Sequence, residues 1–173
     1  MPRALILYVI EKLNTIMEIR HAQLSDSEKI YFTHEASIVA LCKGHYCEQD
    51  VAGWIDILSP DIYENAINEK VMIIAEEADE ILGFGILDTE NKEICAIYIH
   101  PCSKGTGLGK RILFELEFRA QERGLDILTL CSTANALGFY THHGYNVGEQ
   151  TFHELPNGIK LECTKMHKVL NQN

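Results

Sequence analysis

The sequence has no apolar run long enough to cross a membrane. The apolar stretch at residues 4–10 ends at Glu11 and Lys12, whereas a membrane-spanning helix needs about 20 apolar residues. No cleavage site of small residues follows this stretch, so a secretory signal is not expected. Internal repeats and low-complexity segments are missing as well. These absences, in a chain of 173 residues that is 46% hydrophobic, predict one cytoplasmic domain with no membrane partner.

Basic residues are scarce. The chain has 15 lysines and arginines against 25 aspartates and glutamates, which gives a formal net charge of -10. A negative chain is repelled by nucleic acids and by anionic membrane surfaces, so the sequence predicts neither as a partner. The same charge favours a cationic partner.

Cysteine pairs with the C-x-x-C spacing are absent, although the chain has six cysteines. Cys95, Cys131 and Cys163 fall in apolar, strand-like runs, and we expect buried free thiols in a reducing compartment. The segment at residues 42–47 has two cysteines and a histidine, but it matches no common zinc-site spacing. The sequence therefore predicts no metal.

The hydrophobic pattern divides the chain after Met17 into strands and helices. Strands are expected at residues 17–20, 71–77, 80–88, 93–99, 126–131, 145–150 and 159–166, and helices at about 25–41, 48–58, 108–123 and 136–144. Residues 60–66 are expected to form a loop or a helical turn. This order predicts an α+β fold with a mixed central sheet and flanking helices. The predicted domain covers residues 17–168, and residues 169–173 form a tail.

Residues 1–16 are set apart as an N-terminal extension of unknown role, because Met17 opens a stretch that resembles a natural start. A docking helix and an artefact of the translation start are both open explanations. A homodimer is one way to bury its apolar side chains Leu5, Leu7 and Ile10.

A glycine-rich turn lies between the strand at 93–99 and the helix at 108–123. Gly105, Gly107 and Gly109 alternate there with other residues in the stretch HPCSKGTGLGKRIL, which is also basic. Basic residues in a first helical turn face the positive end of the helix dipole, which costs a few tenths to about 1 kcal/mol each unless an anion offsets it. Free backbone N–H groups at such a turn bind anions, and their number favours a pyrophosphate. A plain glycine turn with solvated lysines is the alternative.

This spacing fits neither of two common phosphate-binding motifs. A Walker A loop needs glycine where Lys104 stands and serine or threonine where Arg111 stands. A dinucleotide-binding fingerprint needs a third glycine at the position of Lys110.

Two segments resemble the GNAT superfamily of acetyl-CoA-dependent N-acetyltransferases. IYIHPCSKGTGLGKRIL is similar to motif A of that family, with Lys104 in place of the usual glutamine or arginine. STANALGFYTHHGY is similar to motif B, with Tyr145 in place of the terminal phenylalanine. The resemblance covers residues 17–168, with both motifs in the expected order, and it implies the GNAT-like acyl-CoA N-acyltransferase fold.

The resemblance implies transfer of an acetyl group from acetyl-CoA to a primary amine, by direct attack in a ternary complex. Tyr140 matches the family's general acid. A phenol, with an ordinary pKa near 10, suits a thiolate leaving group. The residues that would bind acetyl-CoA are Ile97, Tyr98, Ile99, Lys104, Gly105, Thr106, Gly107, Leu108, Gly109, Lys110 and Asn135.

The general base and the acceptor are less defined. Glu93 is the best candidate for the base, in competition with Glu76, Glu77, Asp88 and His100. By resemblance, the region that contains His45, Tyr46 and Trp54 walls the acceptor site, and aromatic side chains suit a small cationic acceptor. Helix packing explains Trp54 equally well. A protein or peptide N-acetyltransferase and a non-catalytic CoA-binding module are the alternative functions.

Overall fold

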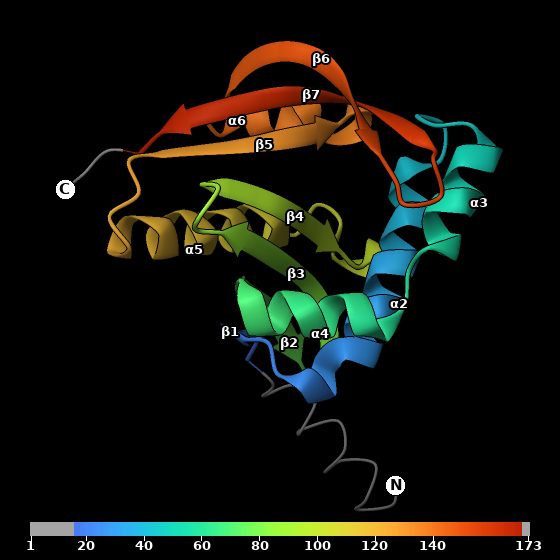
Figure 1. Cartoon of the computed structure of the whole chain (residues 1–173). Helices are drawn as coiled ribbons and strands as arrows, with labels where there is room; N and C mark the ends of the chain where they lie inside the picture. Colours follow the sequence, from blue (N-terminus) through green and yellow to red (C-terminus); the bar gives the residue numbers. More distant parts are fainter. Residues whose placement is uncertain (1–15, 171–173) are drawn as a thin grey trace, which may run out of the picture.

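A seven-stranded mixed sheet forms the centre of the structure, a computed structural model in which residues 16–170 are described. The strand order is β1-β2-β3-β4-β5-β7-β6, and only β4 and β5 are parallel neighbours among the described strands. The strands are β1 (Glu18–His21), β2 (Val71–Glu77), β3 (Glu80–Asp88), β4 (Glu93–Ile99), β5 (Ile127–Thr133), β6 (Asn146–Glu154) and β7 (Lys160–Val169). Figure 1 shows β6 arching over β7. The prediction of an α+β fold with a mixed sheet is confirmed, whereas the predicted extension at residues 1–16 lies almost entirely outside the described residues.

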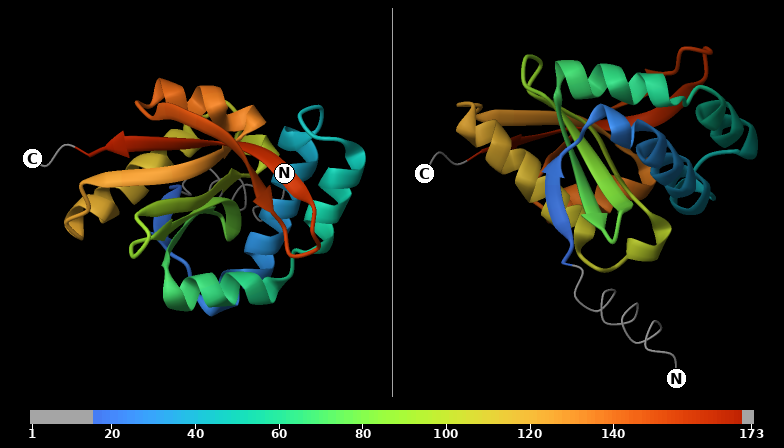
Figure 2. Two further views of the ribbon diagram at one scale, coloured as in Figure 1. Left: turned by 45° about the horizontal axis from the view of Figure 1, so that its top comes forward. Right: turned by 90° about the horizontal axis from the view of Figure 1, so that it is seen from below.

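Helices cover both faces of the sheet. They are α2 (Ser27–Ser37), α3 (Glu48–Asp56), α4 (Pro60–Glu69), α5 (Leu108–Glu122) and α6 (Leu137–His142), with short turns η1 (Leu24–Asp26), η2 (Ile38–Cys42), η3 (Pro101–Ser103) and η4 (Ala134–Ala136). Helices α2 and α4 pack on one face and α5 and α6 on the other, as the two views in Figure 2 show. No helix in the described part of the chain combines the length and the apolar character that crossing a membrane requires.

Strand β2 shows why this sequence forms a covered sheet. Val71, Ile73 and Ala75 belong to the cluster under α5, and Met72 and Ile74 belong to the cluster under α2 and α4. Successive side chains of a strand point to opposite faces, so a continuous apolar run is buried on both sides. The bounds predicted for β2, β3 and β4 agree with the structure.

Several boundaries differ from the prediction, and two of the differences bear on the core. Residues 60–66 are the first part of a ten-residue helix, α4, rather than a loop or a single turn. Pro60 stands in its first turn, where the fixed proline φ suits a helix start, and Tyr63 buries its side chain against the sheet. At the other end, β7 runs to Val169 and Leu170 is buried, so the core extends past residue 168.

The expectation of free cysteines is wrong for two of the six. Cys131 on β5 and Cys163 on β7 form a disulfide with a Cα–Cα distance of 5.8 Å. The two strands pair antiparallel, with Thr133 opposite Cys163, so the two cysteines are diagonal neighbours in the sheet. Cys95 is a free thiol, but it is exposed rather than buried. The disulfide removes the cysteine-based argument for a reducing compartment.

Candidate functional site

Strands β4 and β5 separate soon after they meet. Their only pair in register is Glu93 with Thr129, while the opposite edge of β4 pairs with β3 as far as Ile99. The β3–β4 register shifts at Cys95, which is an extra residue in β4 between the pairs made by Ile94 and Ala96. Such a bulge bends its strand and is common beside active sites. The β5-facing edge of β4 beyond Glu93 is therefore left without a neighbouring strand.

A cavity of about 650 Å³ lies in this opening. Its walls are Ile94–Ile99 of β4, the end of β5, the glycine loop with the first turn of α5, the η4–α6 segment, and the chain from the end of α2 to His45. The predicted residues that line it are Ile97, Tyr98, Ile99, Lys104, Gly105, Gly107, Leu108, Gly109, Lys110, Asn135 and Tyr140. Of the predicted site residues, only Thr106 and Glu93 are not part of this lining.

The glycine loop enters α5 through two left-handed residues. Gly105 has φ 79° and Gly107, the N-cap of α5, has φ 85°, values that other residues adopt only with strain. The loop is closed by Thr106, whose Oγ1 donates to the Ser103 carbonyl at 2.7 Å. The first backbone N–H groups of a helix have no partner inside it, and no acidic residue stands in the first turn of α5. The turn can therefore bind an anion.

The charge of the cavity wall is opposite to that of the whole chain. Among the described residues that line it, none is an aspartate or glutamate. Lys104 and Lys110 contribute positive charge, and His45, His142 and His143 contribute imidazoles. Because the chain has a formal net charge of -10, this segregation favours an anionic ligand in the cavity.

Tyr140 and Asn135 lie on the same side of the cavity, on α6 and η4. Tyr140 is buried, and burial raises the pKa of its phenol. Its hydroxyl bonds to no group in the described part of the chain, so it is available to a ligand. Asn135 Oδ1 accepts from the Cys42 thiol at 3.8 Å, which ties η4 to the segment that follows α2.

The structure does not bring Glu93 into the cavity. Glu93 stands at the start of β4 and lines a separate, smaller cavity under β6. The competing candidates do not line the cavity either. Glu77 is exposed at the end of β2, and the other three have partners elsewhere. Glu76 accepts from Arg20 at 2.8 Å, Asp88 caps the β3–β4 turn and pairs with Lys70 at 3.1 Å, and the His100 ring contacts Cys102.

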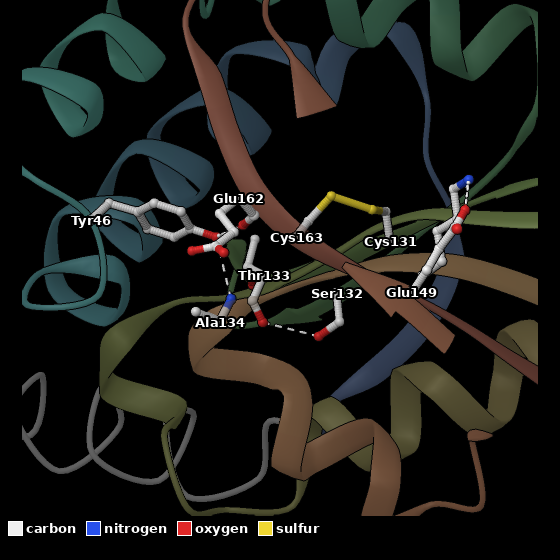
Figure 3. The surroundings of a disulfide bond; sticks show 9 residues. Tyr46, Cys131, Ser132, Thr133, Ala134, Glu149, Glu162 and Cys163 are labelled. Carbon is white, nitrogen blue, oxygen red and sulfur yellow. Dashed lines mark hydrogen bonds and ion pairs between the residues drawn. A yellow bond between two sulfur atoms is a disulfide. The ribbon is translucent and has the colours of Figure 1, made fainter. Parts of the chain in front are cut away.

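The three residues predicted to form the acceptor wall have different positions in the structure. His45 lines the cavity. Tyr46, one residue later, donates its hydroxyl to the Glu162 carbonyl at 2.8 Å and accepts from the Ala134 amide at 3.2 Å, as Figure 3 shows. Trp54 is buried behind them and packs between the rings of Tyr46 and Tyr98.

A buried histidine was missed by sequence reasoning. His34 on α2 lies 3.9 Å from the Tyr98 ring, measured between ring centroids, and its Nδ1 is 2.9 Å from the Tyr63 hydroxyl. Its Nε2 has no partner within the described residues. Burial lowers the pKa of His34 to about 3, so the ring is neutral. A single histidine in α2 gives no sequence signal for this contact with Tyr98.

Several solved structures share this fold. A GCN5-related N-acetyltransferase from Rhodopseudomonas palustris, also named a class-II aminotransferase, is 26% identical with a TM-score of 0.80, covering 90% of this chain and 98% of that chain. The PaiA N-acetyltransferase from Thermoplasma acidophilum, solved with coenzyme A, is 22% identical with a TM-score of 0.74, covering 89% and 99%. YncA from Salmonella typhimurium, solved with acetyl-CoA, is 20% identical with a TM-score of 0.66, covering 91% and 96%.

The edge of β4 left unpaired, the basic glycine loop and the buried Tyr140 meet at one cavity. Residues 42–170 match the family model of the acetyltransferase (GNAT) domain. The chain belongs to the GNAT family, and it is an acetyltransferase.

Proposed function

We propose that the enzyme takes the acetyl group from acetyl-CoA and transfers it to a primary amine of a small cationic molecule by direct attack in a ternary complex. The observation that carries this proposal is a single cavity that connects the basic glycine loop, the unpaired edge of β4 and Tyr140. PaiA and YncA, which share the fold, were solved with coenzyme A and acetyl-CoA.

The glycine loop fits the pyrophosphate of the donor. A Cβ placed on Gly105 or Gly107 would meet no atom within 4 Å, so the space in front of the loop is open. The first-turn amides of α5 face that space together with Lys104 and Lys110. Burying a doubly negative group there is favourable because no carboxylate lines the described cavity.

The unpaired edge of β4 fits the pantetheine arm and the thioester. Ile97, Tyr98 and Ile99 pair with β3 on one edge only, so the backbone groups on the other edge are free to bond an extended ligand as a missing strand would. A backbone N–H aimed at the developing oxyanion stabilises the transition state by about 3 kcal/mol. The apolar side chains of this strand hold its backbone in place.

Tyr140 is the group that protonates the leaving thiolate. Burial raises its pKa, so the phenol keeps its proton until an anion forms beside it. General acids of this kind contribute about 100-fold to 10,000-fold in rate.

The proton of the incoming ammonium goes to His45. Glu93, which the sequence favours for this step, lies on the smaller cavity. His45 is the imidazole on the part of the cavity wall that the chain after α2 forms. An imidazole side chain can act as a general base. The acceptor itself is held by an aromatic face, since aromatic rings bind cations and Tyr98 lines the cavity.

An amine screen tests the function. Purified protein is given acetyl-CoA and single acceptors: polyamines, aminoglycosides, amino acids, and peptides with a free N-terminus or lysine. Thiol release and the mass of the product are measured. We expect turnover with one class of small amine, at a rate that falls in His45→Gln. Turnover with peptides alone would make the enzyme a protein acetyltransferase, and acetyl-CoA binding without turnover on any acceptor would contradict the proposal.

A further inference from the structure

The disulfide occupies an unusual place for a structural cross-link. Cys163 is buried, with 4% of its surface exposed, whereas Cys131 is part of the wall of the large cavity. Figure 3 shows the bond spanning β5 and β7, close to the point where the Tyr46 hydroxyl bonds Glu162 of β7 and Ala134, the first residue of η4. One sulfur of the pair is thus accessible from the cavity, and the other is covered by protein.

Cys131 lies at the end of the cavity that the sulfur of coenzyme A would reach. The opening narrows to the Glu93–Thr129 pair, and Cys131 is two residues beyond Thr129 on β5. The glycine loop follows the opposite, C-terminal end of β4. A ligand whose phosphates bind at the loop and whose arm follows β4 therefore brings its terminal sulfur toward the narrow end. This step rests on the proposed binding of acetyl-CoA.

We propose that Cys131 is a site of covalent modification by the thiol of coenzyme A, the product of acetyl transfer. The CoA thiolate attacks Cys131 Sγ, the Cys131–Cys163 bond breaks, and a Cys131–CoA disulfide forms. The electron pair of the broken bond leaves with Cys163 Sγ, which becomes a thiolate and takes up a proton. One disulfide is exchanged for another, so no oxidant is consumed.

The burial of the two sulfurs sets the direction of attack. In thiol–disulfide exchange, access decides which sulfur is attacked, and only Cys131 faces the cavity. The adduct fills the donor site, so the modified enzyme cannot bind acetyl-CoA. A small dithiol removes the adduct and restores the site.

Two other thiols on the cavity wall provide an internal control. Cys42 and Cys95 also line the cavity but are free. A free thiol and the CoA thiol cannot form a disulfide without an oxidant, because two electrons must be removed. In oxidant-free buffer, the proposal therefore predicts modification at Cys131 and at neither of these residues.

The experiment uses the full chain with its disulfide intact, incubated with CoA in oxygen-free buffer, quenched in acid, and analysed by non-reducing mass spectrometry with peptide mapping. We expect one CoA per chain on Cys131, and acetyl-transfer activity that falls in proportion to the modified fraction and returns with dithiothreitol. Desulfo-CoA, which has no thiol, is expected to bind and to block modification. Acetyl-CoA, whose sulfur is acylated, is expected to give no adduct.

Cys163→Ser is the matched control variant. It keeps Cys131 on the cavity wall but has no disulfide, so CoA should leave it unmodified, whereas the symmetric disulfide of CoA should modify it. The inference is overturned if desulfo-CoA binds the wild-type protein but CoA leaves Cys131 unmodified. An adduct on another cysteine, or a free dithiol without adduct, overturns it as well. A protein that binds no desulfo-CoA in calorimetry contradicts the proposed function itself.

Discussion

In the proposed mechanism, burial suits the Tyr140 phenol to one step, the protonation of the leaving thiolate. Its ring packs against Phe139 and Tyr145 at centroid distances of 5.1 and 5.6 Å, while the residue also lines the cavity. The ring is therefore fixed by the core and the hydroxyl is left to the ligand. The sequence predicted this residue through its resemblance to motif B, since periodicity alone describes a core tyrosine.

Tyr140→Phe is expected to lower kcat about 100-fold or more, because the ring is kept and the proton is lost. The affinity for acetyl-CoA should change little. Single-turnover kinetics, in which chemistry limits the rate, and calorimetric binding are the two measurements. Tyr145→Phe is the control, because the Tyr145 hydroxyl is buried beside α6 outside the cavity lining. Wild-type turnover in Tyr140→Phe would remove this residue from the mechanism.

His34 makes folding stability depend on pH. Its pKa is about 3 in the folded chain, compared with about 6.5 for an unfolded histidine. Between these values the unfolded chain binds the extra proton, so the free energy of unfolding falls as the pH drops through that window, at roughly 1.4 kcal/mol per pH unit. Above pH 6.5 the contribution of this residue is constant.

Urea unfolding at several pH values between 7.5 and 4.5 tests this dependence. His34→Gln is expected to reduce the slope of unfolding free energy against pH by about one proton, because glutamine does not titrate. His153→Gln, on the exposed strand β6, is the control and should leave the slope nearly as it is. An unchanged slope in His34→Gln would show that the buried imidazole is not the source of the dependence.

At the scale of secondary-structure elements, the sequence predicted those features that a local pattern of residues determines. The apolar runs and turn of the β2–β3 hairpin, and the strand β4 after it, have the expected bounds because their signals lie within a few residues. The Cys131–Cys163 bond and the place of Glu93 could not be predicted, because they depend on which distant strands pair and where two strands separate. The length of α4 was missed although a signal was present, because Tyr63, Ala66 and Ile67 recur at helical spacing and pack against the sheet.

The glycine at the start of α5 can be tested against a matched control, the glycine that follows the end of the same helix. Gly107 and Gly124 have φ of 85° and 75°, and a Cβ on either would meet nothing within 4 Å. Glutamate at either position therefore meets similar backbone strain. Gly107→Glu adds a negative charge in front of the anion-binding turn and is expected to weaken acetyl-CoA binding at least tenfold in calorimetry.

Gly124→Glu should bind acetyl-CoA as the wild type does, since Gly124 follows the C-terminal end of α5, outside the cavity lining. The midpoint temperature of thermal unfolding should fall by similar amounts in the two variants. A difference in acetyl-CoA affinity between them would then come from the added charge and not from backbone strain. Equal affinities in the two variants would contradict the role assigned to the glycine loop.

At the scale of the whole molecule, the described wall of the cavity and the family match lie after residue 16. The first described strand, β1, begins at Glu18 and pairs with β2, and the family model matches residues 42–170. Among the described residues, those that line the cavity begin at Ser37. We therefore expect acetyl transfer not to depend on residues 1–16.

A chain that starts at Met17 is expected to keep the kcat and KM of the full chain. Acetyl-transfer kinetics is the first measurement, and sedimentation of both chains reports whether association changes. A lower free energy of unfolding in the truncated chain would not contradict this prediction, since burial of an apolar side chain contributes about 1.5 to 3 kcal/mol. A large loss of turnover in a folded truncated chain of unchanged mass would show that the segment reaches the active site.

The single register pair between β4 and β5 has a consequence for hydrogen exchange. It divides the sheet into two parts, β1–β4 and β5–β7–β6. The two parts are joined by the Glu93–Thr129 pair and by helix α5, which packs in one core cluster with residues of β4 and β5. Amides on the free edge of β4 should exchange with solvent far faster than those of β2, which has a partner on each side. A donor bound along that edge replaces the missing strand. Desulfo-CoA is therefore expected to slow hydrogen exchange in peptides that contain residues 94–99 and to leave exchange in residues 71–77 unchanged. Equal slowing in both segments would mean that the ligand stabilises the whole fold and does not bind specifically along the free edge of β4.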